Sequence, residues 1–422
     1  MMRAKAVILS AMLAVGICFR AIGAIDTTTQ IFNGAFKSLQ TSVDGNPLAP
    51  PVITLGSHDR LTVEFDELAE DARYLRYRLI HCQSDWSVSP LVESEYIDGF
   101  NQAEIADFAL SEQTLAHYVH YRLSIPDGSM APMVSGNYLL QVFDEDDPDE
   151  VLLQTRFMVS EAKASLSAGV TSRTDVDYNQ RHQQLSVEAD LEGAAVGDPF
   201  NDLRLVVMQN GRTDNVAVVD KPLRIASRRA IWEHQPQLIF PGGNEYRRME
   251  MVTVHYPGMG IDHYEYAEPY YHAVLTLDTP RPDARYVYDQ DQSGRFFPGE
   301  LNAADPSVEA DYVVTHFMLE MPELKGREVW LDGDFTQRRR DADSRMVYSP
   351  SRGAYVKTML LKQGLYNYQY LVTPSRPGES ATAPIEGDNY ETVNEYLILL
   401  YHRPPMARAD RLIGATVIQS GK

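Results

Sequence analysis

The sequence predicts a mainly β protein built from serial immunoglobulin-like or early-set β-sandwich domains. Three observations favour this fold class: segments in which apolar and polar residues alternate recur along the chain, 24 prolines help to separate them, and helical periodicity is scarce. The stretch HYVHYRLSI shows the pattern well, because Val119, Tyr121, Leu123 and Ile125 fall on one face of a strand.

Other segments with strand character follow in order. They cover residues 74–82, 136–143, 185–191, 203–209, 270–278, 327–333, 354–361, 365–372 and 395–403. A turn-rich stretch separates residues 117–125 from 136–143, so we expect these two to be sequential antiparallel strands. The stretch EIADFALSEQTLAH, residues 104–117, has the one weak helical pattern.

The first 24 residues have the organisation of a secretory signal peptide. Arg3 and Lys5 precede an apolar run over residues 6–19, and the segment closes on the small pair Gly23 and Ala24. The apolar run is shorter than the ~20 residues that span a bilayer. A lipid anchor on Cys18 would need a small residue before it, where the sequence has isoleucine. We therefore expect an exported, soluble mature protein.

Charge and cysteine content narrow the classes of partner. The formal net charge is −21, which would repel phosphate backbones and anionic lipids, so we expect no nucleic-acid partner and no direct lipid insertion. Of the two cysteines, Cys18 lies in the signal peptide and Cys82 is left alone, so the mature chain has no intramolecular disulfide. Its stability must come from apolar cores.

The composition suggests two boundaries. A small-residue stretch, AKASLSAG, follows the strand-like LQTRFMVSE, and the turn-rich FFPGELNAADPSVEAD precedes VVTHFMLE. We predict a signal peptide at 1–24, a first β-sandwich at 25–160, a middle β domain at 161–308 and an early-set-like sandwich at 309–422.

The segment HCQSDWSVSPLVESEYIDGF concentrates reactive residue types. His81 and Cys82 could form a nucleophile and base, but neighbours on a strand point to opposite faces, and zinc would need further ligands at suitable spacing. The simpler interpretation is a buried cysteine acting as a small hydrophobe, with Trp86 as a core plug. A hydrolase using His81 with Asp85 and a distant carboxylate remains a third functional hypothesis.

Several blocks together carry a family resemblance. HC-xx-DW, YxHYxLxIP and SGNYLLxVF occur in that order, followed by DQDQSGRFF, GLYNYQY and the ending EGDNYETVNEYLILLYHRPPMARADRLIG. Over most of the mature chain this resembles the plug proteins of the type 9 secretion system of Bacteroidota, long a family of unknown function.

The resemblance implies a periplasmic, non-enzymatic β protein that closes the periplasmic opening of the outer-membrane translocon. It implies no catalytic residues, cofactor or metal to carry over. The expected partner is the translocon barrel protein, and we expect the plug to be a monomer. Recognition through scattered surface residues has no local motif, so the sequence assigns no interface residues.

Two acidic stretches have alternative interpretations. Asp289, Asp291, Ser293, Gly294 and Glu300 match the spacing of a calcium loop, but RYVYDQ before them alternates like a strand instead of a helix. A polar hairpin turn with Gly294 at positive φ is the alternative. The run DEDDPDE, residues 144–150, is predicted to be a solvated turn.

The last predicted domain suggests a second function. Residues 327–337 and 346–372 resemble early-set sandwiches that include glycogen- and starch-binding modules, which carry an exposed tryptophan where this chain has Gln337 to Arg339. Tyr366, Tyr368 and Tyr370 share a strand face and could form a stacking platform, or could pack against a neighbouring domain. The alternative function is therefore an exported carbohydrate-binding protein.

Overall fold

The computed structural model describes residues 26–376 and 378–421. The predicted signal peptide lies outside the described residues. Within them the chain forms three β-sandwiches, which confirms the predicted fold class. In the described part of the chain, helices are restricted to single turns, α1 (Glu93–Tyr96), α2 (Pro199–Asp202) and α3 (Pro306–Glu309), and two 3₁₀ turns, η1 (Pro236–Leu238) and η2 (Asp334–Thr336).

Domain 1 spans residues 26–161. One sheet has the order β1 (Gln30–Ile31), β12 (Asp147–Ser160), β11 (Gly136–Asp144), β5 (Leu75–Cys82) and β7 (Ala103–Glu104), with β3 (Val52–Thr54) parallel to the end of β12. The facing sheet has the order β2 (Phe36–Val43), β4 (Leu61–Glu67), β9 (Val119–Ile125) and β8 (Asp107–Leu110). A small ribbon pairs β6 (Ile97–Gly99) with β10 (Met130–Pro132).

Alternation predicted the buried faces of domain 1 correctly. Val119, Tyr121, Leu123 and Ile125 on β9 all lie in the core. Two expectations were wrong. β9 and β11 lie in opposite sheets instead of pairing with each other. Residues 104–117 contain strand β8 and no helix, because this segment pairs with the edge of β9.

Domain 2 combines residues 164–243 with residues 392–421. Its first sheet has the order β13 (Ser165–Thr171), β14 (His182–Asp190), β18 (Arg229–Trp232) and β17 (Arg224–Ala226), with β19 (Ile239–Pro241) also paired to β14. Its second sheet has the order β16 (Val216–Val219), β15 (Leu203–Gln209), β29 (Glu395–His402) and β30 (Arg411–Gln419). Trp232 and Tyr396 are fully buried between them.

Domain 3 spans residues 244–391. One sheet has the order β21 (Ile261–Ala267), β22 (Tyr270–Leu275), β24 (Tyr312–Glu320), β27 (Ala354–Lys362) and β26 (Val347–Ser349). The other groups β20 (Arg247–Glu250), β28 (Gly364–Val372), β23 (Phe296–Pro298) and β25 (Val329–Asp332). An apolar core that includes Phe317 and Tyr368 fills the space between the sheets.

The strand pairing does not follow the predicted division at residue 308. Domain 3 is inserted between β19 and β29 of domain 2, because β29 pairs with β15 along the whole length of β15. The turn-rich stretch at 296–311 is an internal feature of domain 3 and contains α3. Sequence alternation identified β29 as a strand, but a partner almost 200 residues away leaves no local signal.

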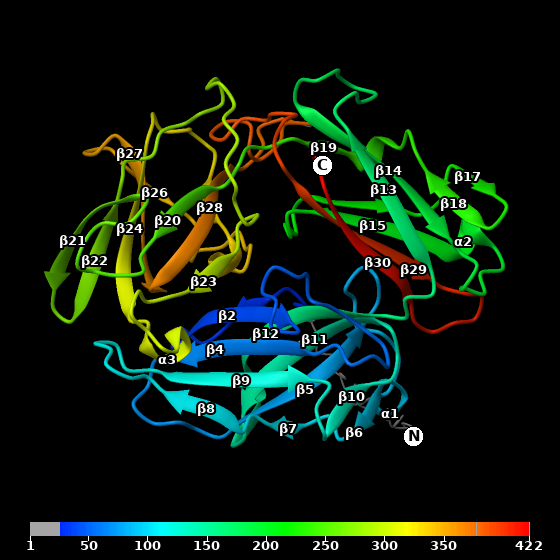
Figure 1. Ribbon diagram of the computed structural model, residues 1–422, viewed down its shortest axis with the longest axis horizontal. Coiled ribbons are helices and arrows are strands. Elements are labelled where there is room, and N and C mark those ends of the chain that lie inside the picture. Colours follow the sequence, from blue (N-terminus) through cyan, green and yellow to red (C-terminus); the bar gives the residue numbers. More distant parts are fainter. Residues whose placement is uncertain (1–25, 377, 422) are drawn as a thin grey trace, which may run out of the picture.

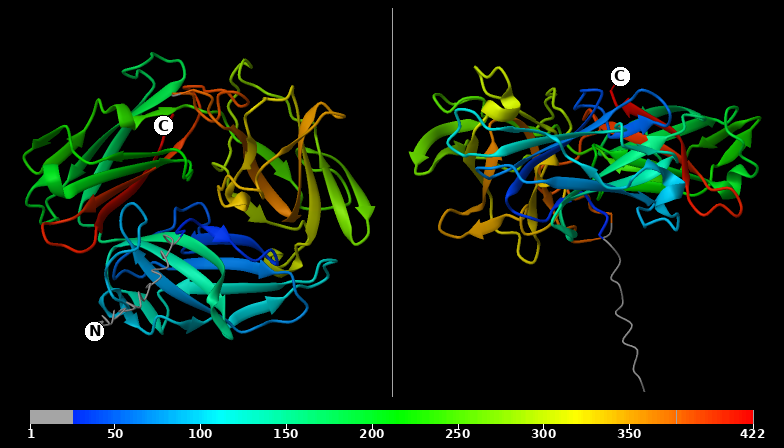
Figure 2. Two further views of the ribbon diagram at one scale, coloured as in Figure 1. Left: turned by 180° about the vertical axis from the view of Figure 1, so that it is seen from behind. Right: turned by 90° about the horizontal axis from the view of Figure 1, so that it is seen from below.

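The three sandwiches lie in one flat layer around a shared centre (Figures 1 and 2). In Figure 1 domain 1 lies below, domain 2 at the upper right and domain 3 at the upper left, and each domain faces both others. The three domains therefore meet in three pairwise contacts.

Candidate functional site at the junction of the three domains

The contact between domains 1 and 3 joins two cross-strand pairs. Asp66 lies opposite His120 in domain 1, and Tyr312 lies opposite Lys362 in domain 3. The Lys362 ammonium is 2.6 Å from Asp66 Oδ2, and both side chains are only 1% exposed. Tyr312 donates a hydrogen bond to the same oxygen, and His120 Nδ1 lies 2.7 Å from the other. This buried ion pair fixes the angle between the two sandwiches.

The environment of Asp66 keeps this carboxylate charged. Burial alone would raise the pKa of Asp66, but Lys362 and His120 outweigh it and hold the pKa below its ordinary value. Burial alone would lower the pKa of His120, but Asp66 and Glu64 outweigh it and raise that pKa. The contact is therefore a fully charged cluster in a dry environment, where removing one partner is costly.

The contact between domains 1 and 2 uses the turn that follows β5. Ser84 donates its backbone N–H to Asp410 Oδ2 at 2.8 Å, and the Asp410 backbone N–H donates to Gln83 Oε1 at 2.9 Å. Tyr401 donates to Asn137 Oδ1 at 2.6 Å. An apolar cluster lies beside these bonds and includes Met158, Leu397, Leu399 and Leu412.

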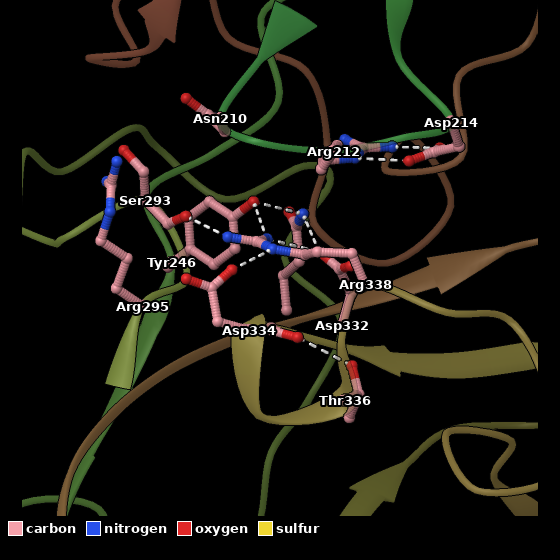
Figure 3. A network of polar contacts seen from close by, with 12 residues as sticks. Asn210, Arg212, Asp214, Tyr246, Ser293, Arg295, Asp332, Asp334, Thr336 and Arg338 are labelled. Atoms are coloured by element: carbon pink, nitrogen blue, oxygen red, sulfur yellow. Dashed lines mark hydrogen bonds and ion pairs between the residues drawn. The ribbon is translucent and has the colours of Figure 1, made fainter. Parts of the chain in front are cut away.

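The contact between domains 2 and 3 is built from arginines. Arg295 of domain 3 lies 2.7 Å from Glu395 of domain 2. In the β15–β16 loop, Arg212 pairs with Asp214 at 2.7 Å, and Asp214 also accepts from Arg340 of domain 3. Figure 3 shows the Arg212–Asp214 pair, with Arg295 on the other side of Tyr246 and Arg338. These ion pairs differ from ordinary surface pairs, because the arginine side chains Arg212 and Arg295 are largely buried.

Arg338 organises the domain 3 side of this contact. Its guanidinium donates to Asp334 at 2.7 Å, to Tyr246 OH at 2.9 Å, to Asp332 at 3.1 Å and to the Ser293 carbonyl at 2.5 Å (Figure 3). The arginine side chain is 6% exposed. All of these acceptors belong to domain 3, so Arg338 cross-links the side of domain 3 that meets domain 2.

A glycine makes room for that guanidinium. Gly294 has φ +84°, and a Cβ built there would lie 2.4 Å from Arg338 Nη2. Any larger residue would be strained in its backbone and would displace the arginine.

The three contacts surround a central cavity of about 550 Å³. Each domain supplies part of its wall, with Trp86 and Arg156 from domain 1, Leu397 from domain 2 and Phe296 from domain 3 among the lining residues. The cavity exists only while the three sandwiches keep this arrangement.

The reactive residues of the HCQSDW segment lie in different surroundings. Cys82 is fully buried and burial raises the pKa of its thiol to about 12, while burial lowers the pKa of His81 to about 4. The His81 ring packs on Tyr138, and Asp85 is exposed and accepts from Ser87. These side chains do not form a nucleophile and base. The buried-cysteine interpretation is confirmed.

Trp86 corrects one detail of that interpretation. It is half-buried and packs on Arg156 and on the apolar cluster shared with domain 2, instead of plugging the core of domain 1. Its φ of +67° places Trp86 in the left-handed region, in the turn that follows β5. The tryptophan therefore belongs to the interdomain contact.

The calcium-spaced residues form a turn. Gly294 has positive φ, and the Arg295 backbone N–H donates to the Gln292 carbonyl at 3.2 Å. Asp289 pairs with Arg248 at 2.9 Å, and Asp291 accepts from the backbone of Tyr246. Residues 285–290 were predicted to alternate as a strand, but they form no strand. Within residues 26–376 and 378–421, no three His, Cys, Asp or Glu side chains gather as they would around a metal ion.

The tyrosine face lies inside domain 3. Tyr366, Tyr368 and Tyr370 are 1%, 2% and 0% exposed and pack in the core of their own sandwich, so they cannot serve as a stacking platform. Gln337 to Arg339 line the central cavity instead. The acidic run at 144–150 was predicted to be a solvated turn, but only residues 145–146 form the turn. Asp144 ends β11 and residues 147–150 begin β12, where they are exposed.

The sequence did not reveal most of the junction. Asp66, Lys362, Arg212 and Asp214 were not identified because isolated charges usually lie on a solvated face. One signal was available: Lys362 follows the apolar run MLL at the end of a strand, where an unpaired lysine would be expensive to bury.

Fold and site together define the class, a multidomain β-sandwich protein whose domains are locked by buried interdomain polar contacts. Residues 36–161 match the family model described as the type 9 secretion system plug protein 1st domain. Domain 1 therefore belongs to the family of type 9 secretion system plug protein 1st domains. The family and the sandwich fold point to a non-enzymatic protein with a role related to type 9 secretion in the cell envelope.

Solved structures extend the comparison. The crystal structure of a hypothetical protein from Parabacteroides merdae is 39% identical, covers 94% of this chain and 100% of its own, and superposes with a TM-score of 0.91. A DNA-bound alkylpurine DNA glycosylase from Pseudomonas fluorescens is 14% identical over 29% of each chain, and its TM-score of 0.15 carries no argument. No curated protein matches the chain.

Within residues 26–376 and 378–421, no helix has the length and apolar character needed to cross a membrane.

Proposed function

We propose that this protein is a non-enzymatic periplasmic plug that binds and closes the periplasmic opening of the type 9 secretion translocon in the outer membrane. A single copy acts as the stopper. The observation that carries the proposal is the family match of domain 1, read together with a three-domain body whose parts are fixed to one another by buried ion pairs.

Rigidity is the property that a stopper needs. A body whose domains moved freely would leave gaps when pressed against an opening, whereas interdomain interfaces held by buried charge pairs resist that motion. The near-complete superposition on the Parabacteroides merdae protein supports one shared arrangement of the three domains, because a rotated domain would lower a whole-chain TM-score.

The acidic surface suits a plug that must be released. With a net charge of −21 the free protein repels its own copies and the anionic surfaces around it. Binding to the translocon must then depend on a particular state of the opening, which makes the closure reversible.

The first test is affinity purification of the tagged protein from detergent-solubilised outer membranes of the native cell, followed by mass spectrometry. We expect a very large β-barrel protein in near-equal amount. Recovery of the bait alone would overturn the proposal.

The second test links closure to rigidity. Cells without the gene should admit large antibiotics that the outer membrane normally excludes, and the wild-type gene should restore the barrier. The variant R295E breaks the contact with Glu395 and should fail to restore it, whereas R295E/E395R reverses the pair and should succeed. Equal barriers in cells with and without the gene would refute a plug.

A further inference from the structure

The central cavity contains a cation that lacks an acidic partner. Arg156 lies on β12, where its Nε donates to the Thr27 carbonyl at 2.6 Å and its guanidinium lies 4.2 Å from the centre of the Trp86 ring. Among residues 26–376 and 378–421 it makes no salt bridge. Burial lowers the pKa of Arg156 to about 10, which still leaves it charged at neutral pH.

The acidic side chains that line the cavity are already neutralised. Glu395 pairs with Arg295, Asp214 pairs with two arginines, Asp334 pairs with Arg338, and Asp26 lies 3.5 Å from Arg339. Five arginines and four acidic residues line the wall. Arg338 and Arg339 have further acidic partners in Asp332 and Asp341, so Arg156 is the one lining arginine that pairs with no carboxylate among the described residues.

The rest of the wall provides an apolar surface beside Arg156. It includes Trp86, Met158, Met208, Leu397 and Phe296. Methionine side chains adapt to the shape of a bound group, and an aromatic ring offers a face for stacking. A volume of about 550 Å³ at a domain junction is also typical of small-molecule sites.

We infer that the central cavity is a binding site for a small organic anion, with its acidic group on Arg156 and its apolar body against Trp86, Met208 and Leu397. A charge-assisted hydrogen bond to the guanidinium supplies the specificity, because no other lining cation lacks an acidic partner. This site goes beyond closure of a pore and does not depend on it.

Occupation of the site stabilises the closed arrangement of the domains. The wall comes from all three sandwiches, so a ligand that bridges them binds the assembled body and not one in which a domain has turned away. The anion thus acts as a small-molecule stabiliser of the three-domain body.

The test uses two fluorescent probes that differ by one group. 1-Anilinonaphthalene-8-sulfonate carries a sulfonate, and N-phenyl-1-naphthylamine is the same apolar body without it. Titration of the mature protein should give one saturable site for the sulfonate probe. The variant R156Q should weaken binding of that probe about tenfold, and should change binding of the neutral probe less than twofold.

Matched variants separate the site from general effects. Arg78 stacks on Phe143 in the same sheet but does not line the cavity, so R78Q should leave both probes unchanged. M208W fills the cavity and should weaken both probes, with circular dichroism confirming that the variant is folded. R156K keeps the charge and should retain part of the sulfonate affinity.

Three results would overturn the inference. These are the absence of a saturable sulfonate site in the wild type, equal sulfonate affinity in R156Q and the wild type, and unchanged binding in folded M208W.

Discussion

Replacing Lys362 by methionine should destabilise the contact between domains 1 and 3 by about 3–5 kcal/mol. The ammonium lies 2.6 Å from Asp66, and both side chains are 1% exposed. Methionine fills most of the same volume, so the main effect is an uncompensated buried carboxylate, and breaking a buried pair from one side costs that much. Tyr312 and His120 remain as hydrogen-bond partners of Asp66, which places the expected loss at the lower end of the range.

The double variant D66N/K362M tests the cause. Asparagine can keep the hydrogen bond from Tyr312 without a charge, so the double variant should recover most of the stability lost in K362M. Urea unfolding followed by circular dichroism measures the difference for each variant. A loss below about 1 kcal/mol in K362M, or a double variant no better than K362M, would refute a tightly coupled buried pair.

The pH dependence of K362M gives a second reading of the same contact. Without the lysine, protonated His120 is the cation nearest to Asp66, and its folded-state pKa is raised above 6.5. A histidine whose pKa is raised on folding contributes stability that is fully present below its unfolded-state pKa and is lost as pH rises through its folded-state pKa. K362M should therefore lose stability as the solution is taken from pH 6 to pH 8, more steeply than the wild type.

Three further predictions concern other positions. G294A should lower the free energy of unfolding by about 2–4 kcal/mol, because a Cβ would displace Arg338. The control G353A has a similar positive φ, but its Cβ would meet no atom within 4 Å, so it should cost about 1 kcal/mol. Equal losses of the two variants in urea unfolding would contradict this. Burial raises the pKa of Glu245 to about 7, so the stability that this residue contributes is fully present below pH 4.5 and is lost as pH rises through 7. The variant E245Q should therefore be more stable than the wild type by up to about 3 kcal/mol at pH 8.5, and equally stable at pH 4. Cys82 in the mature chain should resist a thiol reagent at pH 8 until guanidinium unfolds the protein, and rapid labelling of the native state would show that it is accessible.

Local patterns predicted the strands well because side-chain alternation is a local property. The segment at 74–82 was predicted to be a strand, and on β5 Leu75, Tyr77, Leu79 and His81 alternate as buried residues; the strands at 203–209 and 395–403 were also identified. The pairing of those two strands was not predicted. The alternation within a strand shows which of its faces is buried. It does not show which other strand pairs with it, because any apolar strand of similar length would fit equally well.

The candidate site was difficult to predict for a related reason. Gln83 and Ser84 lie in the HCQSDW segment, but their partner Asp410 lies more than 300 residues away. The calcium spacing of Asp289 to Glu300 is a local coincidence, and the same residues have a structural use beside Tyr246 and Arg338. Charge and spacing describe what a residue can do, and the tertiary partner decides which of these roles it has.

Three of the blocks that carry the family resemblance lie where domains or segments meet. The HC-xx-DW block supplies the turn that binds Asp410, and the DQDQSGRFF block supplies Gly294, which admits Arg338. In the block EGDNYETVNEY, Asn394 donates to Gln183 and to the Gly242 carbonyl at the point where the chain returns to domain 2. An enzyme family would be expected to share reactive groups around a pocket. Here these three blocks hold the domains and segments in place, which is the property that the proposed closure of an opening requires.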